Sequence, residues 1–427
     1  MDKPARRIFT ATLGCKINQY ETQAIVEAWR DGGYGHAEHA SDADVILVNS
    51  CAVTSKAVAD LRKTVRRLHR ENPEAGIIVT GCAAQVLREE LAELPGVVRV
   101  VPQESKSELL RPRSGSFSIS DYPRARAVVM VQDGCSHGCT YCIVPLTRGP
   151  SRSREVAEIL DEAEKLLEAG FHELILSGVN LRQFGRDLAP GPSGDHPDFW
   201  DLLRMLEERL SRFAGRARLR LSSVEPGQLG GKALEVLGGS KLASPHLHLS
   251  LQAGDPEVLR RMGRGHYRAE QAEEFLERLS TRWPIFGLGA DLLTGFPGET
   301  EAQFENTLDF CRRLPLSYAH VFPYSSRPGT PAANMRDKVP AAEKKRRAAL
   351  LRELAEARKT AFLERVSRLE RVDVLVQDVR GNGVCEYYAP CRFTRPGPEI
   401  AARALVPARP VGVRRGVVLV EPLERAE

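Results

Sequence analysis

The first hundred residues alternate between short apolar runs and amphipathic stretches. Apolar runs at Ile8 to Leu13, Val45 to Val48 and Ile77 to Thr80 predict strands, and helical spacing over 22–29 and 57–70 fills the gaps between them. A parallel return between strands needs a crossover of about that length. We therefore expect an amino-terminal α/β domain with a parallel sheet.

The middle of the chain repeats this alternation. The helical patterns are 155–169, 200–213, 269–280 and 301–314. Six strand candidates lie between them, at 127–132, 173–177, 217–222, 246–251, 286–293 and 318–323. Six strands interleaved with helices predict a partial (βα)6 barrel, since a complete barrel of this type has eight.

The carboxyl-terminal part changes pattern. A long charged helix is expected over 341–370, and short β-like runs follow it: VDVLVQDV, GVCEYYAPCRF, IAARALVPA and GVVLVEPL. Their Gly and Pro turns predict a small antiparallel β domain, either a barrel or an open sheet. With a linker expected from about 103 to 126, the predicted domains are 1–110, 121–350 and 365–427.

Composition agrees with three soluble domains. The chain has 427 residues, of which 42% are hydrophobic and 27% charged. It begins without an apolar leader and has no run of 18 apolar residues, so we expect a cytoplasmic protein with no membrane partner. The net charge of +5 permits a nucleic-acid partner. Basic segments at 148–154, 344–347 and 392–415 are either contacts for such a partner or solvated faces.

Three of the nine cysteines follow predicted strands of the first domain. Cys15, Cys51 and Cys82 each come within three residues of a strand end. The carboxyl ends of parallel strands meet at one edge of a sheet, where open α/β sheets bind ligands. The three thiols are therefore expected to meet at one edge.

A second set of cysteines is clustered in DGCSHGCTYC. Cys135, Cys139 and Cys142 have the spacing C-x3-C-x2-C directly after a predicted strand. Three thiolates suit a four-iron four-sulfur cluster with one iron open to another ligand. A zinc site closed by His137 is the alternative, but four ligands do not converge easily in so short a loop.

This loop resembles that of the radical S-adenosylmethionine superfamily, with Tyr141 as the aromatic before the last cysteine. The resemblance implies that the open iron binds S-adenosylmethionine and that one electron cleaves it to a radical. It also places three later strand ends near that cofactor, and these contain Gly178 and Asn180 (SGVN), Ser222, Ser223 and Glu225 (LSSVEP), and Gln252 (LSLQAG). No residue is assigned a catalytic role beyond this.

The wider pattern resembles the methylthiotransferase branch of that superfamily. TLGCKINQYET, VNSCAVT and TGCAAQ match its first domain, and LSLQAGDPEVLRRMGRGHY with TGFPGET match its radical core. The resemblance implies that Cys15, Cys51 and Cys82 hold a second four-iron four-sulfur cluster, which carries the sulfur to be transferred. It also implies a carboxyl-terminal TRAM-like RNA-binding domain, although here that segment matches poorly beyond GVCEYYAPCRF.

The motifs LGCKINQYET and HVFPYSSRPGTPAA (320–333) most resemble those of enzymes that act on N6-threonylcarbamoyladenosine beside the tRNA anticodon. Isopentenyladenosine in tRNA and an aspartate of a ribosomal protein are the alternative substrates. The expected partners are the tRNA anticodon loop, an external electron donor and a sulfur donor. A non-catalytic RNA-binding protein whose cysteines hold zinc is the alternative of another class.

Other cysteines, histidines and aromatic residues are expected to be structural. Cys311 lies on a helix, and Cys385 and Cys391 flank a strand. His246 and His248 alternate along a strand and are expected to be packed or hydrogen-bonded rather than metal ligands. Three aromatic side chains near the carboxyl terminus either stack on bases or belong to a core: Tyr387, Tyr388 and Phe393.

Overall fold

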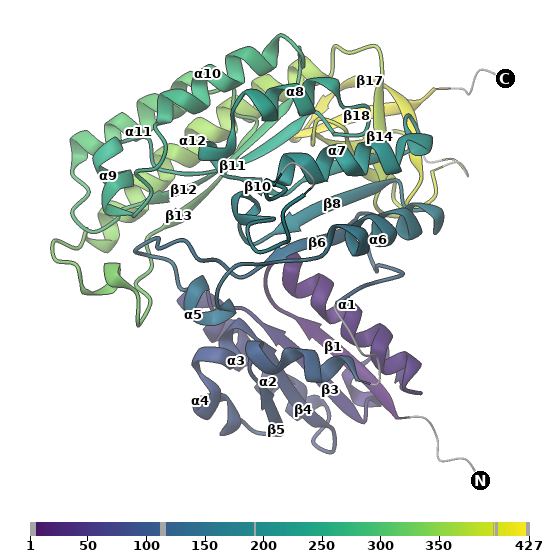
Figure 1. The fold of residues 1–427 in the computed structure, drawn as a ribbon. Coiled ribbons are helices and arrows are strands. Elements are labelled where there is room, and N and C mark those ends of the chain that lie inside the picture. Colours follow the sequence, from purple (N-terminus) through teal and green to yellow (C-terminus); the bar gives the residue numbers. More distant parts are fainter. Residues whose placement is uncertain (1–5, 112–116, 192–193, 396, 398–399, 424–427) are drawn as a thin grey trace. The chain divides into compact units, whose positions relative to one another are not determined.

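The fold is that of a computed structural model, which describes all residues except 1–5, 112–116, 192–193, 396, 398–399 and 424–427 (Figure 1). The chain forms two compact units. The first comprises Met1–Asp121, Asp133–Arg152 and Ser325–Ala333, and the second comprises Tyr122–Gln132, Ser153–Tyr324 and Asn334–Glu427. Each unit is described by itself.

The first unit is built on a parallel sheet with the strand order β2-β1-β3-β4-β5. The strands are β1 Arg7–Thr12, β2 Gly35–His36, β3 Val45–Ser50, β4 Gly76–Gly81 and β5 Val97–Val101. The helices are α1 Lys16–Asp31, α2 Ser55–Glu71, α3 Cys82–Val86, α4 Arg88–Ala92 and α5 Val144–Arg148, with the 3-10 helices η1 Ala40–Asp42 and η2 Gln103–Leu110. This confirms the predicted parallel α/β sheet and adds β2 and β5, which the apolar pattern did not predict.

Helix α2 shows why this sequence folds as it does. Thr54 caps its amino terminus by accepting the Ala57 N–H, and its buried face is Val58, Leu61, Val65 and Leu68. Helix η2, in contrast, falls where a linker was expected. It is held in place because its Lys106 is buried against Glu21 of α1.

The second unit contains a partial barrel of parallel strands, as predicted. Two four-stranded sheets, β7-β6-β8-β9 and β10-β11-β12-β13, make up this barrel. The strands are β6 Ala127–Asp133, β7 Arg152–Ser153, β8 Glu173–Gly178, β9 Arg218–Leu221, β10 Ser223–Val224, β11 His246–Gln252, β12 Gly287–Thr294 and β13 Tyr318–Pro323. Six of these eight correspond to the predicted strands.

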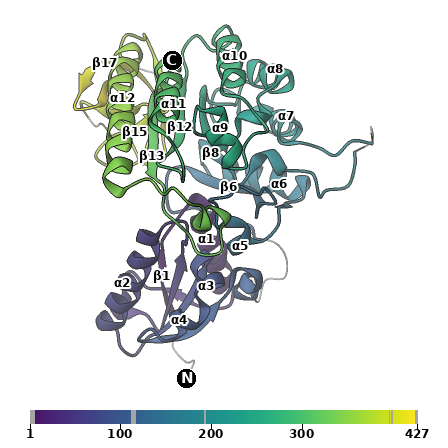
Figure 2. The same ribbon diagram turned by 90° about the vertical axis from the view of Figure 1, so that its left-hand side faces the viewer.

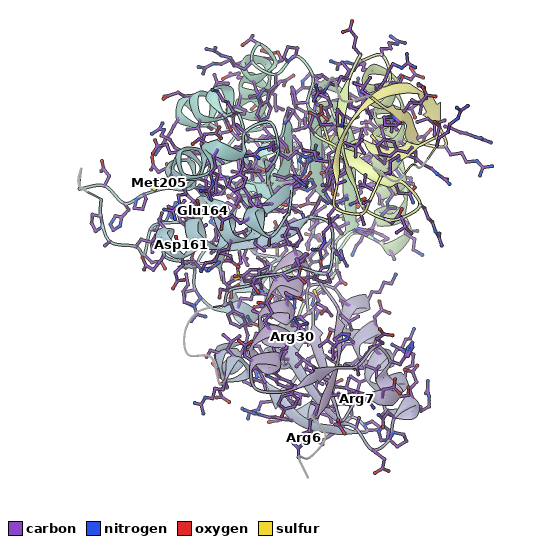
Figure 3. The ribbon with its side chains drawn as sticks, turned by 90° about the vertical axis from the view of Figure 1, so that its right-hand side faces the viewer. Arg6, Arg7, Arg30, Asp161, Glu164 and Met205 are labelled. Carbon is purple, nitrogen blue, oxygen red and sulfur yellow. The ribbon has the colours of Figure 1, made fainter. Side chains whose placement is uncertain are left out.

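Helices cover the outer side of these sheets (Figures 1 and 2). They are α6 Val156–Glu168, α7 Phe199–Arg209, α8 Gly231–Gly239, α9 Pro256–Arg261, α10 Ala269–Ser280, α11 Glu301–Arg313 and α12 Ala341–Val366, with the 3-10 helices η3 Leu181–Gln183, η4 Ser211–Phe213 and η5 Pro226–Gln228. The 3-10 helix η6 Pro331–Asn334 begins in the segment 325–333 of the first unit. Ion pairs join α6 and α7 at the surface, since Arg209 lies 3.2 Å from Asp161 and 2.7 Å from Glu164. Figure 3 labels these two acidic residues of α6.

The carboxyl-terminal domain is a small closed barrel, β14-β15-β16-β18-β17. Its strands are β14 Val372–Val376, β15 Asn382–Cys385, β16 Pro390–Phe393, β17 Leu405–Arg414 and β18 Val417–Pro422. The predicted antiparallel pairing is found throughout except between β16 and β18, which run parallel.

A buried ion cluster joins this small barrel to the partial barrel within the second unit. Glu173 of β8 lies 2.6 Å from both Arg218 and Arg220 of β9. These arginines also donate to backbone carbonyls of the small barrel, at 2.7 Å to Asp373 and 2.9 Å to Val384 for Arg218. The two arginines keep the pKa of the buried Glu173 well below its usual range despite burial, which acts the other way.

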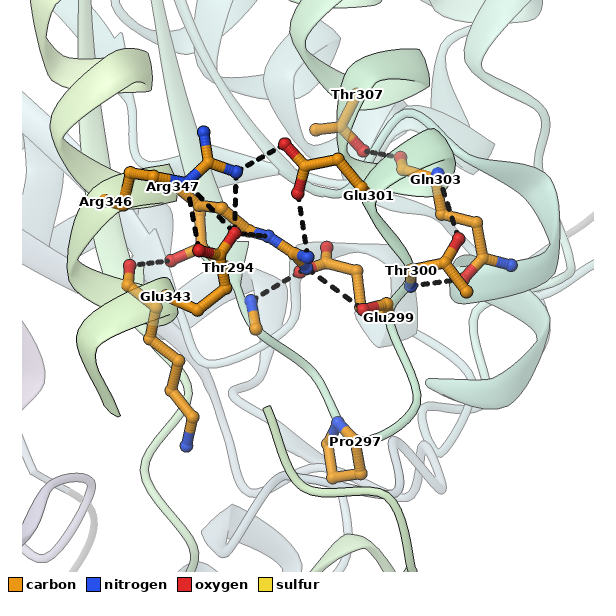
Figure 4. Close-up of polar contacts among 12 residues, drawn as sticks. Thr294, Pro297, Glu299, Thr300, Glu301, Gln303, Thr307, Glu343, Arg346 and Arg347 are labelled. Atoms are coloured by element: carbon orange, nitrogen blue, oxygen red, sulfur yellow. Dashed lines mark hydrogen bonds and ion pairs between the residues drawn. The ribbon is translucent and has the colours of Figure 1, made fainter. Parts of the chain in front are cut away.

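The basic run at 344–347 is in part buried, whereas the sequence pattern allowed either a nucleic-acid contact or a solvated face. Arg347 lies 2.8 Å from Glu299, 3.0 Å from Glu301 and 2.9 Å from Glu343, and its side chain is 5% exposed (Figure 4). Glu299 lies in the loop before α11, Glu301 begins α11, and Glu343 belongs to α12 itself. Arg347 therefore connects α12 to the start of α11 and to the loop before it. Throughout the described residues, no helix combines the length and apolar character needed to cross a membrane.

Candidate functional site

The carboxyl edge of the first unit's sheet brings three cysteines together. Strands β1, β3 and β4 are adjacent and parallel. Cys51 and Cys82 directly follow β3 and β4, and Cys15 comes three residues after the end of β1. A left-handed glycine makes the last turn: Gly81 has a φ of +94°, and a Cβ there would lie 2.4 Å from the side chain of Asn49. The structure therefore places these three thiols at one sheet edge, as the sequence predicted.

The three thiols influence one another. Burial raises the pKa of Cys51 most. The neighbouring Cys82 raises it further, and Cys15 does so to a smaller extent. A Cβ on Gly14 would lie 3.0 Å from the Cβ of Cys51, so the first and second strand ends are in direct contact. Cysteine thiols bind a cationic metal centre as thiolates. The donor set thus fits an iron-sulfur cluster.

A buried arginine connects this edge with the second cysteine loop. Arg148 donates to Asp133 at 2.6 Å, to Glu21 at 3.1 Å and to Asn18 at 3.2 Å. The same Asn18 oxygen accepts the Cys15 thiol hydrogen at 3.1 Å. Arg148 thus places positive charge close to the thiols. The sequence pattern, which allowed a partner contact or a solvated face for the basic segment 148–154, did not predict this buried role.

Glu21 is the centre of this buried network. Its side chain is 1% exposed and pairs with Lys106 at 2.5 Å and with Arg148. Burial acts to raise its pKa, but the two cations outweigh burial and lower the pKa to about 2. Glu21 is therefore an anion that holds two cations under the cysteine edge.

The loop of Cys135, Cys139 and Cys142 also belongs to the first unit. Its backbone is fixed by hydrogen bonds from Cys135 N–H to the Gly149 carbonyl at 3.0 Å and from Cys142 N–H to the Cys139 carbonyl at 3.1 Å. Tyr141, Cys139 and Cys142 are half-buried, and Cys135 is buried. Three thiols on one fixed loop fit a cluster that leaves one iron open.

A distant piece of chain, the segment 325–333, completes the first unit. Arg327 donates to the Ser55 hydroxyl at 3.0 Å, and Ala332 N–H donates to the Thr140 carbonyl at 2.8 Å. The segment 325–333 therefore contacts both the start of helix α2, just after Cys51, and the loop that contains Cys135, Cys139 and Cys142. The segment lies within the motif HVFPYSSRPGTPAA, but no pattern in that motif predicted the role of Arg327.

In the second unit, two of the expected cofactor residues lie at the end of β8. Gly178 ends that strand, and a Cβ there would lie 3.1 Å from Gln132 Oε1. The same Gln132 oxygen accepts the Asn180 N–H at 2.8 Å. This close packing explains the glycine and fixes the turn that carries Asn180.

Ser222 follows β9 and is 7% exposed. Its hydroxyl oxygen is buried and has no hydrogen-bond partner among the residues that the structure describes. A buried hydroxyl without a partner costs free energy, so it is suited to a ligand that supplies one.

Glu225 and Gln252 are placed differently. Glu225 is buried and lies 3.2 Å from Arg264 and 3.1 Å from His266. Gln252 has a φ of +68° at an irregular position of β11, a strained conformation that side chains adopt mainly at functional sites. Whether these residues contact a cofactor remains a prediction.

The inner side of β11, β12 and β13 carries a chain of hydrogen bonds. Tyr318 Oη lies 2.9 Å from His246 and from His248, and His248 and His320 lie 3.1 and 3.2 Å from the same oxygen of Asp291. His246 and His248 are thus hydrogen-bonded, as expected. The absence of a side chain at Gly289 leaves space for these hydrogen-bonded side chains, because a Cβ there would lie 2.2 Å from the Tyr318 ring.

The remaining sulfur and aromatic side chains are structural. Cys311, Cys385 and Cys391 are buried, and Phe393 belongs to the core of the small barrel. Tyr387 packs partly buried against that core. Tyr388 has its ring centroid 4.5 Å from that of His246 and 5.5 Å from that of Tyr318. For these aromatic residues the structure favours packing over base stacking.

Comparisons with known proteins match this architecture. The uncharacterized protein family UPF0004 matches residues 7–102, and the Radical SAM superfamily matches residues 129–311. Three relatives carry the name threonylcarbamoyladenosine tRNA methylthiotransferase MtaB. That of Bacillus subtilis is 36% identical (77% of this chain, 75% of the relative), that of Aquifex aeolicus 33% (86% and 92%) and that of Rickettsia prowazekii 32% (95% and 95%).

A solved structure shares the fold. The radical S-adenosylmethionine methyltransferase TsrM from Kitasatospora setae, solved with cobalamin and a [4Fe-4S] cluster, superposes with a TM-score of 0.56. It is 16% identical, and the match covers 77% of each chain.

Proposed function

The chain belongs to the radical S-adenosylmethionine methylthiotransferase family, and on this premise we propose that it adds a methylthio group to carbon 2 of N6-threonylcarbamoyladenosine beside the tRNA anticodon. As a member of this family it is an enzyme that uses S-adenosylmethionine and two four-iron four-sulfur clusters. The substrate is the part that we propose.

The observation that carries the proposal is the meeting of Cys15, Cys51 and Cys82 at one sheet edge. Cysteines on a loop such as 135–142 are shared by radical enzymes of many kinds. A second set of three thiols in the same unit fits an enzyme that must also hold the sulfur it transfers. We assign Cys15, Cys51 and Cys82 to the second cluster and Cys135, Cys139 and Cys142 to the cluster that binds S-adenosylmethionine.

When bound, the cluster and S-adenosylmethionine supply a radical able to remove hydrogen from an unactivated carbon. The chain's own residues hold and shield this chemistry. We propose that S-adenosylmethionine is bound by Tyr141, Gly178, Asn180, Ser222, Glu225 and Gln252. In this set the unpartnered Ser222 hydroxyl would receive a hydrogen bond from the cofactor's polar groups or donate one to them.

The proposed base follows from the names of the relatives and from the motif at 320–333. Three relatives named for threonylcarbamoyladenosine tRNA are 32–36% identical over most of the chain. Isopentenyladenosine in tRNA and a ribosomal-protein aspartate are the other substrates considered, and the experiment below separates all three.

The test is the modified-nucleoside profile of tRNA from cells with and without the gene. We expect loss of the methylthio form of threonylcarbamoyladenosine and accumulation of its precursor, both restored by the intact gene but not by Cys51→Ala. Loss of methylthio-isopentenyladenosine instead would identify isopentenyladenosine in tRNA as the substrate. An unchanged tRNA profile with a mass change in a ribosomal protein would assign the third substrate.

Partners follow from the same chemistry. The enzyme requires an external electron donor and a sulfur donor, and we place the reaction in the cytoplasm, where tRNA is found.

The small barrel offers a groove of about 600 Å³ whose lining includes Arg380, Arg392, Arg414 and Arg415. Guanidinium groups in a groove suit the phosphates of a tRNA backbone, and we propose that it docks the substrate.

The rival reading, a zinc-stabilised RNA-binding protein, makes a different prediction for Cys139→Ala. It predicts loss of folding, because structural zinc supplies folding free energy. Our proposal predicts a folded protein that retains about half of its iron and no longer cleaves S-adenosylmethionine. Iron and sulfide analysis with circular dichroism of this variant decides between them.

A further inference from the structure

Arg327 is a buried cation without a carboxylate partner. Its side chain is 7% exposed. Among the described residues, the Ser55 hydroxyl is the side chain that accepts from its guanidinium, at 3.0 Å, and its buried Nε has no hydrogen-bond partner. None of the described Asp and Glu residues forms an ion pair with it.

This arrangement differs from the other buried arginines of the chain. Arg148, Arg220 and Arg347 each lie within 2.8 Å of at least one carboxylate. Burying a charge costs several kcal/mol unless an opposite charge and hydrogen bonds compensate. A guanidinium that is buried but uncompensated is thus suited to an anion that binds from outside the chain.

Cys51 is close enough to Arg327 to interact with it electrostatically. Burial lowers the pKa of Arg327, and a thiolate at Cys51 acts in the opposite direction. Ser55, the hydrogen-bond partner of Arg327, begins helix α2 four residues after Cys51. Neighbouring bonds fix the arginine's position, because the Arg327 carbonyl accepts from the Thr330 N–H at 3.2 Å and from its hydroxyl at 2.7 Å.

We propose that Arg327 is a positioning residue that binds the anionic iron-sulfur assembly held by Cys15, Cys51 and Cys82. Thiolates and sulfide give such an assembly net negative charge, and each electron added makes it more negative. A guanidinium beside Cys51 stabilises the reduced form more than the oxidised form, so it raises the reduction potential of this cluster. The five-donor fork of arginine also leaves Nε to donate to a sulfur atom.

The inference rests on the proposed function in one respect, the assignment of the second cluster to these three cysteines. Another anion, the carboxylate or phosphate of the RNA substrate, is the competing ligand. We argue for the cluster because Arg327 bonds to Ser55, four residues after Cys51, and interacts electrostatically with Cys51 itself. Binding to the RNA is an explicit outcome of the test.

The experiment uses the full chain with Cys135, Cys139 and Cys142 replaced by Ala, so that the second cluster alone contributes to the signal. After anaerobic reconstitution, its midpoint potential is measured by redox titration followed by electron paramagnetic resonance. Arg327→Met and Arg327→Lys are compared with Arg67→Met, which removes an exposed arginine of the same unit that pairs with Glu71. Circular dichroism checks folding, and RNA affinity is measured with tRNA on proteins that carry both clusters.

We expect Arg327→Met to lower the midpoint potential or to lose the second cluster while remaining folded, Arg327→Lys to stay close to the unsubstituted protein, and Arg67→Met to change neither. A potential unchanged in Arg327→Met overturns the inference, and a fall in tRNA affinity with it would assign Arg327 to the RNA. If the protein with native Arg327 binds no iron at these cysteines, the proposed function itself fails, which is a separate result.

Discussion

Buried charged residues near Cys15, Cys51 and Cys82 stabilise the first unit and place positive charge close to these thiols. Arg148, Glu21, Lys106 and Asp133 come from four separate parts of the chain, yet they form one buried ion network. The sequence could not reveal it, because whether a charged residue is buried depends on partners far along the chain. Arg148 and Glu21 are 127 residues apart, so a basic run that contains Arg148 is read locally as a solvated surface.

Replacing Arg148 with Met should destabilise the first unit strongly. The change leaves Glu21 and Asp133 with less compensation, and breaking a buried pair costs about 3–5 kcal/mol. The opening free energy of α1, measured by hydrogen–deuterium exchange, should fall by that order. The control Arg67→Met removes an exposed pair and should cost less than about 1 kcal/mol; equal effects for the two variants would contradict the network.

The stability of this unit should also fall in acid. Because the folded pKa of Glu21 is lowered to about 2 from an ordinary value of 4.5, its contribution is complete above pH about 4.5 and is lost as the pH falls towards 2. Acid unfolding of the cluster-free protein, followed by circular dichroism, should be less steep over this window in Glu21→Gln, which should also be less stable at neutral pH. Identical acid profiles would show that Glu21 is not held as an anion.

At the scale of elements, the strand ends were the predictable part. Apolar runs followed by cysteines predicted β1, β3 and β4 and the edge where Cys15, Cys51 and Cys82 meet, because parallel strands present their carboxyl ends together. Short elements escaped prediction: α3 and α4 have five residues each, too few for a helical period to show. The segment 325–333 was also unpredictable, since it joins a unit whose other residues precede 153.

Gly81→Ala should disturb the cysteine edge specifically. A Cβ at this position would lie 2.4 Å from Asn49 Oδ1 and from the Ser50 carbonyl, so the turn that delivers Cys82 has to move. We expect loss of the second cluster, seen as about half the iron per protein, with S-adenosylmethionine cleavage retained.

Gly33→Ala is the matched control for that change. Gly33 has a similar φ of +87°, but a Cβ there meets nothing within 4 Å. It should carry the same backbone strain, about 1 kcal/mol or more, and keep the iron of both clusters. Equal iron loss in both variants would attribute the effect to strain instead of displacement of Cys82.

At the scale of the whole molecule, the small barrel is joined to the partial barrel by Glu173, Arg218 and Arg220, and its groove carries four arginines. The sequence predicted a small β domain but not which of its basic residues share a surface, because that depends on how β16, β17 and β18 pair. Arg392 and Arg414 meet in the groove from different strands.

Replacing Arg392 and Arg414 with Ala should weaken tRNA binding without changing S-adenosylmethionine cleavage. Each lost phosphate contact should reduce the slope of log affinity against log salt by about 1. Fluorescence anisotropy with tRNA between low and moderate salt measures this, and Arg67→Met again serves as the control. An unchanged salt slope would remove the groove from the docking surface.

The central claim, methylthio transfer to threonylcarbamoyladenosine, is tested most directly by the purified enzyme. The protein reconstituted with iron and sulfide is incubated anaerobically with S-adenosylmethionine, a reductant and tRNA carrying either threonylcarbamoyladenosine or isopentenyladenosine, and the nucleosides are analysed by mass spectrometry. We predict the methylthio product from the first tRNA alone, and none from Cys51→Ala. Product from the isopentenyladenosine tRNA alone, or equal product from Cys51→Ala, would contradict the account.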